Sequence, residues 1–385
     1  MDKKTILIDS FDGYIIDNVD DLIDSTNDVL LIKNSKYTDN NTEQNSRLTV
    51  IKDSSRLGAF YQVKIRMDSN MYSDITIRCS EEKANVWFTI CKEILTTAYK
   101  WEIKTGDEYA PIYDESYYTE IQAFLSSYQT KDEVEILKSN IISDKFIHGF
   151  STRKGGLSTA KGVLSLNMTA ANIKRDSEMI GRENIRRLGT KAGFNPTSFL
   201  RARAVHGNTV YVVGQEEPKD GYDCIISNQK DITVAAPGAD CVTMIFADHA
   251  TPAFGACHSG WKGTLAKACV ETVKKMQDEY GSKLENIRVA LGPSIGPCCL
   301  EFAEEDAALF KGINENSIIR KEGKAKPFID LQLVNRTLLE THGIAPSHID
   351  DKSATLCTSC HPELLFSYRR DGIPFGNQVG FIGLK

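Results

Sequence analysis

The sequence contains no run of about 18 consecutive apolar residues, the length that a membrane-spanning helix needs. Its first residues, MDKKTILIDSFDGY, include no long apolar segment followed by a small-residue cleavage site, so we expect no secretory signal. Basic residues are also outnumbered: 46 Lys and Arg against 52 Asp and Glu give a net charge of −6. These absences argue against a membrane span, export and a nucleic-acid partner held by a basic surface, and they favour a cytoplasmic protein.

Glycine and proline are scarce in the first part of the chain. Residues 1–140 contain three of the 27 glycines (Gly13, Gly58 and Gly106) and one of the 11 prolines. Turns that bring the backbone close to a ligand need glycine, so we expect the working site after residue 140. We predict two domains, a smaller α+β N-terminal domain of unknown role over 1–140 and a catalytic domain over 141–385.

The N-terminal residues predict a small sheet with helices. Apolar patterning indicates strands at Thr5–Ile8, Val29–Ile32, Arg47–Lys52, Tyr61–Met67 and Asp74–Arg78. Helical spacing of apolar residues indicates two helices, over Ala84–Tyr99 and Tyr117–Tyr128. No combination of residues in this part indicates a catalytic chemistry.

The stretch from Val234 to Thr264 is the most informative part of the sequence. Two short apolar runs, VTMIFA and AFGAC, are bounded by Gly, Pro and Asp and predict two buried strands. Cys241 precedes the first run and His258 follows the second, so a hairpin-like return brings a thiol and an imidazole together. A glycine-flanked loop then leads into a predicted helix over Thr264–Tyr280, whose start offers backbone N–H groups to an anion.

The thiol and the imidazole allow two kinds of catalysis. In one interpretation Cys241 is a nucleophile and His258 its base, as in thiol hydrolases and deamidases. In the other, His206 joins them in a three-ligand zinc site with an open fourth position, as catalytic zinc requires. The three residues lie 35 and 17 positions apart, so they converge only through the fold, and the spacing does not decide between the two.

The other cysteines give weaker signals. Cys357-Thr-Ser-Cys360-His361 matches the haem-attachment motif C-x-x-C-H, but such attachment normally requires an exported chain. A zinc knuckle built on Cys357 and Cys360 would need a second pair of ligands, and we expect none. The adjacent Cys298 and Cys299 are too close for a relaxed disulfide, so we expect them to be packing residues.

A basic glycine turn, Thr152-Arg153-Lys154-Gly155-Gly156, follows a predicted strand. An arginine beside two glycines is suited to holding an anionic ligand, because the guanidinium pairs with phosphate oxygens and the backbone can approach closely. The alternative is a surface turn with two solvated cations.

Seven motifs in this order resemble those of one family. They are FIHGFSTRKGG (146–156), VHGN (205–208), GADC (238–241), HSGWKGT (258–264), GPSIGPCC (292–299), CTSCHPE (357–363) and FSYRRDG (366–372). Together they resemble the laccase-domain proteins, once called multicopper polyphenol oxidases, over about residues 145–385. The N-terminal extension is similar to that of the animal branch of the family. The resemblance implies an α/β fold in α/β/β/α layers with mixed sheets.

In this family the metal ligands fall in the VHG, ADC and HxGW motifs, which here implies His206, Cys241 and His258. Zinc is favoured over copper, because a multicopper oxidase needs many more histidine ligands than the seven histidines of this chain provide. The resemblance implies zinc-dependent phosphorolysis of inosine, guanosine, adenosine and methylthioadenosine, together with deamination of adenosine.

On this hypothesis further residues contact the substrates, with Arg153, Gly155 and Gly156 holding phosphate and Asn167 contacting the sugar. Asp240 either has a functional role, as a proton-transfer group or as a support for the ligand Cys241, or is a turn residue that starts a strand. The expected partners are purine nucleosides and phosphate, with a protein partner of the N-terminal domain left open, in a monomer or homodimer. The alternatives are a Cys241/His258 thiol hydrolase or deamidase, and a non-catalytic metal-binding scaffold.

Overall fold

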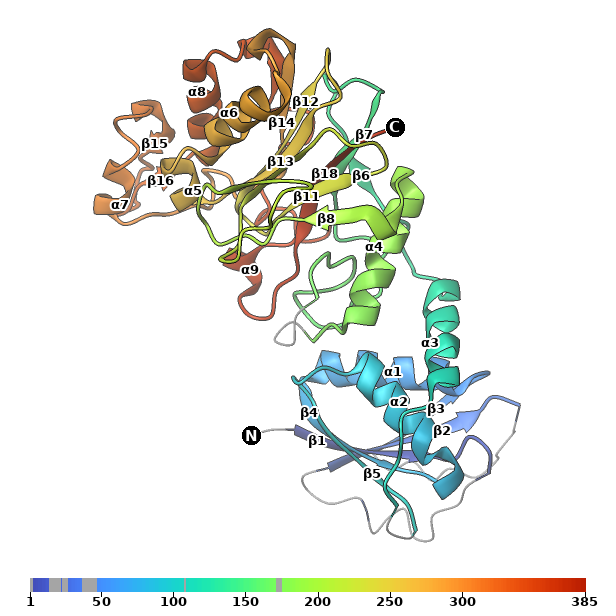
Figure 1. Cartoon of the computed structure of the whole chain (residues 1–385). Helices are drawn as coiled ribbons and strands as arrows, with labels where there is room; N and C mark the ends of the chain where they lie inside the picture. The colour runs from blue at the N-terminus through green and yellow to red at the C-terminus, as the bar shows by residue number, and fades with distance from the viewer. Residues whose placement is uncertain (1–2, 14–21, 23–26, 37–46, 107–108, 171–174) are drawn as a thin grey trace. The chain divides into compact units, whose positions relative to one another are not determined.

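The computed structural model of the chain describes residues 3–13, 22, 27–36, 47–106, 109–170 and 175–385. They form two compact units that alternate along the chain (Figure 1). The first unit comprises Met1–Thr130, Leu157–Leu164 and Ala170–Glu183, and the second comprises Lys131–Gly156, Ser165–Thr169 and Asn184–Lys385. A single boundary near residue 140 stays a prediction.

The first unit is built on a five-stranded sheet of order β3-β2-β1-β4-β5, in which every described pair is parallel. Its strands are β1 (Lys3–Asp9), β2 (Asn27–Asn34), β3 (Leu48–Asp53), β4 (Tyr72–Arg78) and β5 (Lys100–Lys104). Its helices are α1 (Arg56–Asn70), α2 (Ala84–Ile94) and α3 (Glu115–Ser127). Sheet and helices share one apolar core around Phe60 and Trp87. The sequence analysis expected an α+β domain and did not predict that the strands of its sheet are parallel.

One element of this unit differs from the sequence prediction. Residues Tyr61–Met67, predicted as a strand, lie inside helix α1. The buried side chains of the whole segment, Leu57, Phe60 and Lys64 among them, follow the spacing of a helix, whereas the alternation in the shorter window is local. The Ser55 side chain also caps the first turn by accepting a backbone N–H at 2.9 Å. The strand prediction was therefore wrong.

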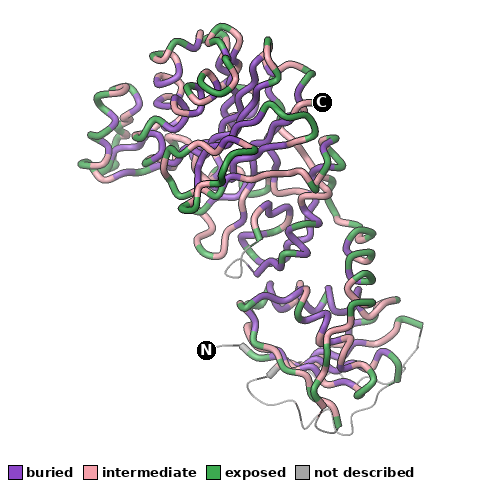
Figure 2. The backbone as a smooth tube through the Cα atoms, viewed as in Figure 1, coloured by how far each residue is buried: buried purple, intermediate pink, exposed green. Residues whose placement is uncertain are grey.

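The second unit contains two mixed sheets that pack face to face. The six-stranded sheet has the order β17-β14-β12-β13-β10-β9, with β9 (Val210–Val212), β10 (Cys224–Ser227), β12 (Val242–Asp248), β13 (Phe254–Ser259), β14 (Ile287–Leu291) and β17 (Ile349–Asp350). The five-stranded sheet has the order β6-β7-β18-β11-β8, with β6 (Ile136–Leu137), β7 (Phe146–Ser151), β8 (Phe199–Arg201), β11 (Thr233–Gly238) and β18 (Gln378–Leu384). Phe150, Ile245, Phe254 and Ile382 fill the space between them. Figure 2 shows these strands as mostly buried.

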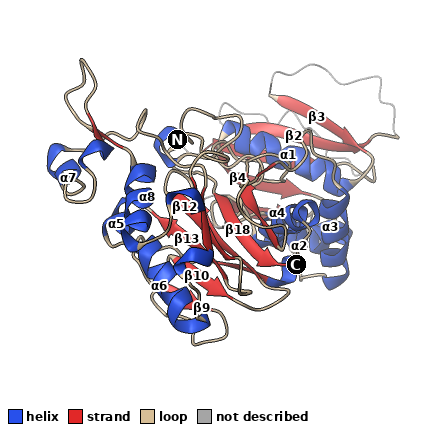
Figure 3. Cartoon of the chain, turned by 90° about the horizontal axis from the view of Figure 1, so that it is seen from above, coloured by secondary structure: helices blue, strands red, loops and turns tan. Residues whose placement is uncertain are grey.

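Helices cover the outer face of each sheet. Helices α6 (Ala268–Tyr280) and α8 (Leu331–His342) pack on the six-stranded sheet (Figure 3). The C-terminal half of α4 (Glu178–Ala192) packs on the other sheet through Leu188. The shorter elements are α5 (Trp261–Leu265), α7 (Glu304–Ala308), α9 (Tyr368–Asp371), β15 (Ile318–Ile319) and β16 (Phe328–Ile329). The layers follow the order α/β/β/α, and the predicted fold class is confirmed.

The central stretch forms two adjacent antiparallel strands, β12 and β13, as predicted, with Thr243 opposite His258. The helix predicted over Thr264–Tyr280 is instead divided into α5 and α6. Lys267 causes the division, because its left-handed backbone conformation, with φ of 60°, cannot continue a right-handed helix. No helix among the described residues is both long and apolar enough to cross a membrane.

Candidate functional site

The structure brings His206, Cys241 and His258 together. One ligand atom of each lies within 4.8 Å of the others, and the two imidazole rings are 5.0 Å apart and nearly perpendicular. Cys241 directly precedes β12 and His258 lies near the end of β13, so the antiparallel pairing places both at one end of the sheet. His206 belongs to a turn and adopts a left-handed φ of 66°.

Asp223 holds two of these residues in place. Its carboxylate accepts a hydrogen bond from His258 Nδ1 at 2.7 Å and others from the backbone N–H groups of His206 and Gly207 at 2.9 and 2.7 Å. Burial favours a neutral carboxyl, but these hydrogen bonds and the charge of His258 prevail and lower the pKa of Asp223. A histidine whose Nδ1 donates to a carboxylate presents Nε2 to a metal or substrate.

Sequence analysis did not identify Asp223, which there looks like an ordinary turn residue before an apolar strand. Its role depends on the pairing of β10 with β13, which sets Cys224 opposite Cys257 and thereby brings the preceding aspartate beside His258. No local motif carries that information.

The electrostatic surroundings favour an anionic thiol. Burial alone raises the pKa of Cys241, but the charges and hydrogen bonds of His258 and His206 outweigh it and lower that pKa below its ordinary value. Burial likewise lowers the pKa of His258, while the nearby Cys241 and Asp223 raise it above its ordinary value. Two imidazoles and a thiolate are a donor set that suits zinc and other divalent transition metals.

Gly260 leaves space for the three ligands. A Cβ atom added to Gly260 would lie 2.9 Å from Cys241 Sγ and 3.0 Å from His206 Cδ2. Any larger residue would therefore push against both ligands, so the glycine permits their close approach.

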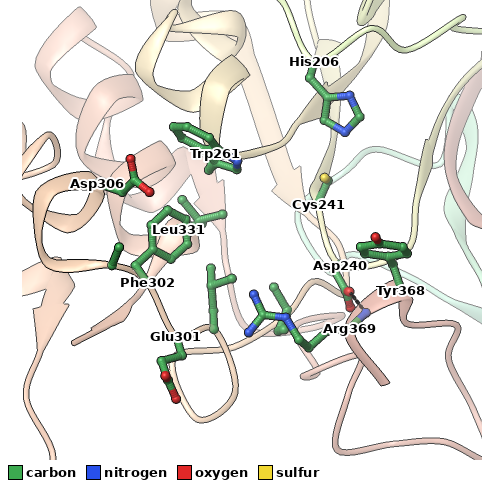
Figure 4. Close-up of a pocket in the computed structure, with 13 residues that line it drawn as sticks. His206, Asp240, Cys241, Trp261, Glu301, Phe302, Asp306, Leu331, Tyr368 and Arg369 are labelled. Atoms are coloured by element: carbon green, nitrogen blue, oxygen red, sulfur yellow. Dashed lines mark hydrogen bonds between the residues drawn. The ribbon is translucent and has the colours of Figure 1, made fainter. Parts of the chain in front are cut away.

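A pocket of about 390 Å³ opens beside His206 and Cys241 (Figure 4). Its apolar walls are Trp261, Ile295, Leu300, Phe302 and Leu331, and its charged groups are Asp240, Glu301, Asp306 and Arg369. The rings of Trp261 and Phe302 lie 5.8 Å apart at a right angle. A volume of several hundred cubic ångströms with mostly apolar walls and a few charged groups is typical of a site for a small organic ligand.

Asp240 lies in the wall of the pocket next to Cys241. Its carboxylate accepts a hydrogen bond from Thr358 Oγ1 at 2.7 Å. It accepts another from the backbone N–H of Arg369 at 2.6 Å (Figure 4). Burial raises the pKa of Asp240, although these donors lower it in part. Its backbone has a φ of 111°, which is rare for a residue other than glycine, so the hydrogen bonds offset local strain.

The other predicted substrate residues do not line this pocket. Arg153 donates to the carbonyl of Pro362 and lies over the ring of Phe366. Gly155 and Gly156 pack tightly, because added Cβ atoms would lie 2.5 Å from Val134 N and 2.3 Å from the backbone of Leu166.

The buried Asn167 accepts the backbone N–H of Asn377 at 2.9 Å and donates to the carbonyl of Thr169 at 2.7 Å. It thereby joins the segment before β18 to the loop around residue 168. The substrate roles assigned to Arg153, Gly155, Gly156 and Asn167 stay predictions.

The interpretation of the C-terminal cysteines requires a correction. We expected no second pair of ligands near Cys357 and Cys360, and we expected Cys298 and Cys299 to be packing residues. The structure instead gathers all four side chains, with one exposed and one half-buried cysteine in each pair. The second pair lies about sixty residues away in the chain, which is why the sequence around Cys357 did not show it.

The fold and the site define a layered α/β protein with a three-residue candidate metal centre beside a small-molecule pocket. A family model described as multi-copper polyphenol oxidoreductase laccase matches residues 147–385, and the chain belongs to this family. The resemblance stated from the motifs is thereby confirmed.

Relatives and solved structures agree with this assignment. A Mus musculus protein named purine nucleoside phosphorylase LACC1 is 37% identical over 345 residues, which is 85% of this chain and 80% of the relative. The Bacillus subtilis purine nucleoside phosphorylase YlmD is 30% identical over 64% of this chain and 92% of its own length. The crystal structure of YlmD from Geobacillus stearothermophilus, 26% identical, superimposes with a TM-score of 0.58 over 67% of this chain and 98% of that structure.

Proposed function

We propose that the chain is a zinc-dependent purine nucleoside phosphorylase, active on inosine, guanosine, adenosine and methylthioadenosine, that also deaminates adenosine. The observation that carries this proposal is the position of His206 and Cys241 in the wall of an aromatic pocket. The names of the mouse, human and Bacillus subtilis relatives support phosphorolysis. A relative 25% identical over 60% of this chain, named adenosine deaminase RL5, supports deamination.

His206, Cys241 and His258 fit zinc, because their donor atoms converge, the two histidines lower the pKa of the Cys241 thiol, and three protein ligands would leave the fourth position that catalytic zinc needs. When bound, zinc supplies a Lewis acid that polarises an oxygen atom in that open position. Asp223 fixes the ring of His258 and the turn that carries His206, so the ligands are positioned before any substrate enters.

The pocket walls provide for a purine and a ribose. One of the two perpendicular rings, Trp261 or Phe302, offers its face to a flat base and the other offers its edge, and the carboxylates of Glu301 and Asp306 accept hydrogen bonds from ribose hydroxyl groups. Arg369 supplies the positive charge of the pocket for phosphate, in addition to the role proposed for Arg153. In phosphorolysis a phosphate oxygen bonds to C1′ of the ribose, the bond from C1′ to the base breaks, and the base leaves with a proton.

Deamination uses the same pocket for a different bond. Water adds its oxygen to the purine carbon that carries the amino group, and ammonia leaves. Asp240 is proposed as a positioning or proton-transfer group. Both of its oxygens are engaged by Thr358 and Arg369, which favours positioning.

The test is an assay of the purified full chain with inosine and phosphate. We expect hypoxanthine and ribose 1-phosphate in equal amounts, loss of turnover on zinc removal, and recovery on zinc addition. His258→Ala should abolish turnover, whereas His342→Gln, a change on helix α8 away from the pocket lining, should keep it. Release of free ribose, or no turnover by the zinc-loaded chain, would overturn the phosphorylase proposal.

The competing function is a thiol hydrolase, and the lowered pKa of Cys241 beside His258 favours it. Alkylation of the thiol and chelation of the metal distinguish the thiol hydrolase from the zinc-dependent phosphorylase. Cys257, the neighbouring thiol, lies buried in the core 3.2 Å from the sulfur of Cys224, so it competes little for the label. Activity that survives a chelator shown to remove the metal, but not alkylation of Cys241, would establish the thiol enzyme.

Cys241→Asp sharpens the choice between these functions, because aspartate can bind zinc but is not a thiol nucleophile. We expect this variant to keep weak zinc-dependent phosphorolysis. A metal-loaded wild-type chain without any nucleoside turnover would instead indicate a metal-binding scaffold. A cytoplasmic location, a monomer or homodimer, and a protein partner of the N-terminal residues remain part of the proposal.

A further inference from the structure

Four cysteines form a second cluster in the second unit. Cys298, Cys299, Cys357 and Cys360 have sulfur atoms that all lie within 4.8 Å of one another. Cys360 Sγ is 3.6 Å from Cys298 Sγ and 3.5 Å from Cys299 Sγ. Four sulfurs at about 2.3 Å from a tetrahedral zinc are about 3.8 Å apart, so the observed spacing is close to that of a zinc tetrathiolate. The distances are too long for disulfide bonds, which join sulfurs at about 2.05 Å.

The backbone holds the two halves of the cluster together. Ser294 N–H donates to the carbonyl of Leu356 at 3.2 Å, and Thr358 N–H donates to the carbonyl of Ser294 at 3.0 Å. The N–H of Gly296 points at Cys357 Sγ at 3.3 Å. A donor aimed at a sulfur stabilises its thiolate form, which is the form that binds a metal.

Nearby cations suit a cluster that carries negative charge. Lys321 Nζ lies 3.0 Å from the carbonyl oxygen of Cys298, and Arg369 Nη1 lies 3.3 Å from that of Cys299. Four thiolates around one Zn²⁺ leave a net charge of −2, and the positive charges of Lys321 and Arg369, held at the carbonyl groups of two of the four cysteines, act against it.

We propose that Cys298, Cys299, Cys357 and Cys360 bind a second zinc ion, in a closed four-thiolate site that is structural. The site joins the loop after β14 to the turn before α9, two segments that no regular strand pairing connects. The site also borders the pocket. Leu300 and Glu301, which line the pocket, directly follow Cys299. Thr358, which lies between Cys357 and Cys360 in the chain, donates to the pocket residue Asp240. The metal therefore fixes one wall of the pocket without meeting the substrate.

Metal content of the full chain, purified with a reductant, tests the proposal. We expect about two zinc ions per wild-type chain and about one in either Cys360→Ser or His258→Ala. Cys269→Ser is the matched control and should keep both ions, because that buried thiol belongs to neither cluster and lies against the carbonyl of Asn335. Cobalt in place of zinc should give His258→Ala the absorption of a centre with four thiolates. Unchanged metal content in Cys360→Ser, or a single wild-type ion that is lost in His258→Ala and kept in Cys360→Ser, would overturn the proposal.

Thiol labelling of the wild type keeps the test valid if the variants do not fold. Cys298 and Cys360 are exposed, so a maleimide should reach them unless a metal occupies their sulfurs. We expect labelling of both only after a chelator has removed the metal. Immediate labelling before chelation, or a disulfide among the four cysteines in freshly isolated chains, would refute the site. Neither readout depends on nucleoside turnover, so failure of the proposed function would leave this result unaffected.

Discussion

At the scale of single residues, Asp223 positions two proposed ligands of the candidate metal centre without being a ligand itself. We expect Asp223→Asn to weaken metal binding about 10–100-fold. The neutral amide orients the His258 ring less well, and it lacks the negative charge that interacts with this ring. Asn is nearly isosteric, so the fold should persist. Competition against a chromophoric chelator measures the affinity directly.

The matched control for this change is Asp220→Asn, an exposed acidic residue three positions earlier in the same loop. It removes the same charge from the loop but makes no contact with His258 among those described. Equal affinities for the two variants would show that Asp223 does not position the ligand.

At the scale of elements, a small buried polar network joins α8 to the end of β13 and to α5. Asn335 Oδ1 accepts from Ser259 Oγ at 2.9 Å, and its Nδ2 donates to Thr264 Oγ1 at 3.0 Å and to the carbonyl of Leu331 at 2.8 Å. Ser259 follows His258, so this network also sets the end of β13 at the metal centre.

We expect Asn335→Ala to lower the free energy of unfolding by about 2–3 kcal/mol, because it leaves buried hydroxyl groups with fewer partners. Denaturant unfolding of the full chain, followed by tryptophan fluorescence, measures the loss of unfolding free energy. Thr341→Ala, at an exposed position of the same helix, should change stability by less than about 0.5 kcal/mol. Similar losses in both variants would contradict the role of the network.

The sequence predicts those elements whose local pattern agrees with their environment. Continuous apolar runs bounded by turn residues marked β12 and β13, because both strands are buried on both faces. Tyr61–Met67 was misassigned because its alternation matched a strand, while the helical spacing became visible only with residues outside that window. The break at Lys267 has no propensity signal, since the left-handed conformation of a lysine depends on its surroundings.

Prediction of the sites shows the same limit. The ligands His206, Cys241 and His258 were proposed because motif resemblance adds information that spacing lacks. The four-cysteine cluster was not predicted, because Cys298 and Cys360 meet only through contacts between Ser294 and its distant neighbours. Tertiary convergence of this kind leaves no trace in local sequence.

At the scale of the whole molecule, the first unit depends on two segments that follow residue 156. Lys64 and Asp68, both fully buried, form an ion pair at 2.8 Å, and Arg175 Nε lies 2.9 Å from the other oxygen of Asp68. Thr159 donates to Asp68 at 2.5 Å. The charges of this network therefore come from helix α1 and from a part of the chain more than ninety positions away.

We expect Asp68→Asn to destabilise the chain by about 3–5 kcal/mol, because two buried cations then lack their carboxylate. Differential scanning calorimetry of the full chain should show an unfolding transition shifted to a lower temperature. Glu120→Gln removes an exposed charge from the same unit and should leave that transition in place. An unshifted transition for Asp68→Asn would mean that the network adds nothing to stability.

The alternation of the two units has a consequence for the order in which the chain is made. Residues 1–130 leave the ribosome first, but the unit that they begin is completed only at residue 183, another 53 residues later. At about 5–20 residues per second this takes roughly 3–10 s, during which Asp68 waits for Arg175 and the apolar face of α1 lacks Leu157 and Ile180. A nascent chain paused in that interval presents an incomplete core, and it is the stage of synthesis at which a chaperone would have the most to bind.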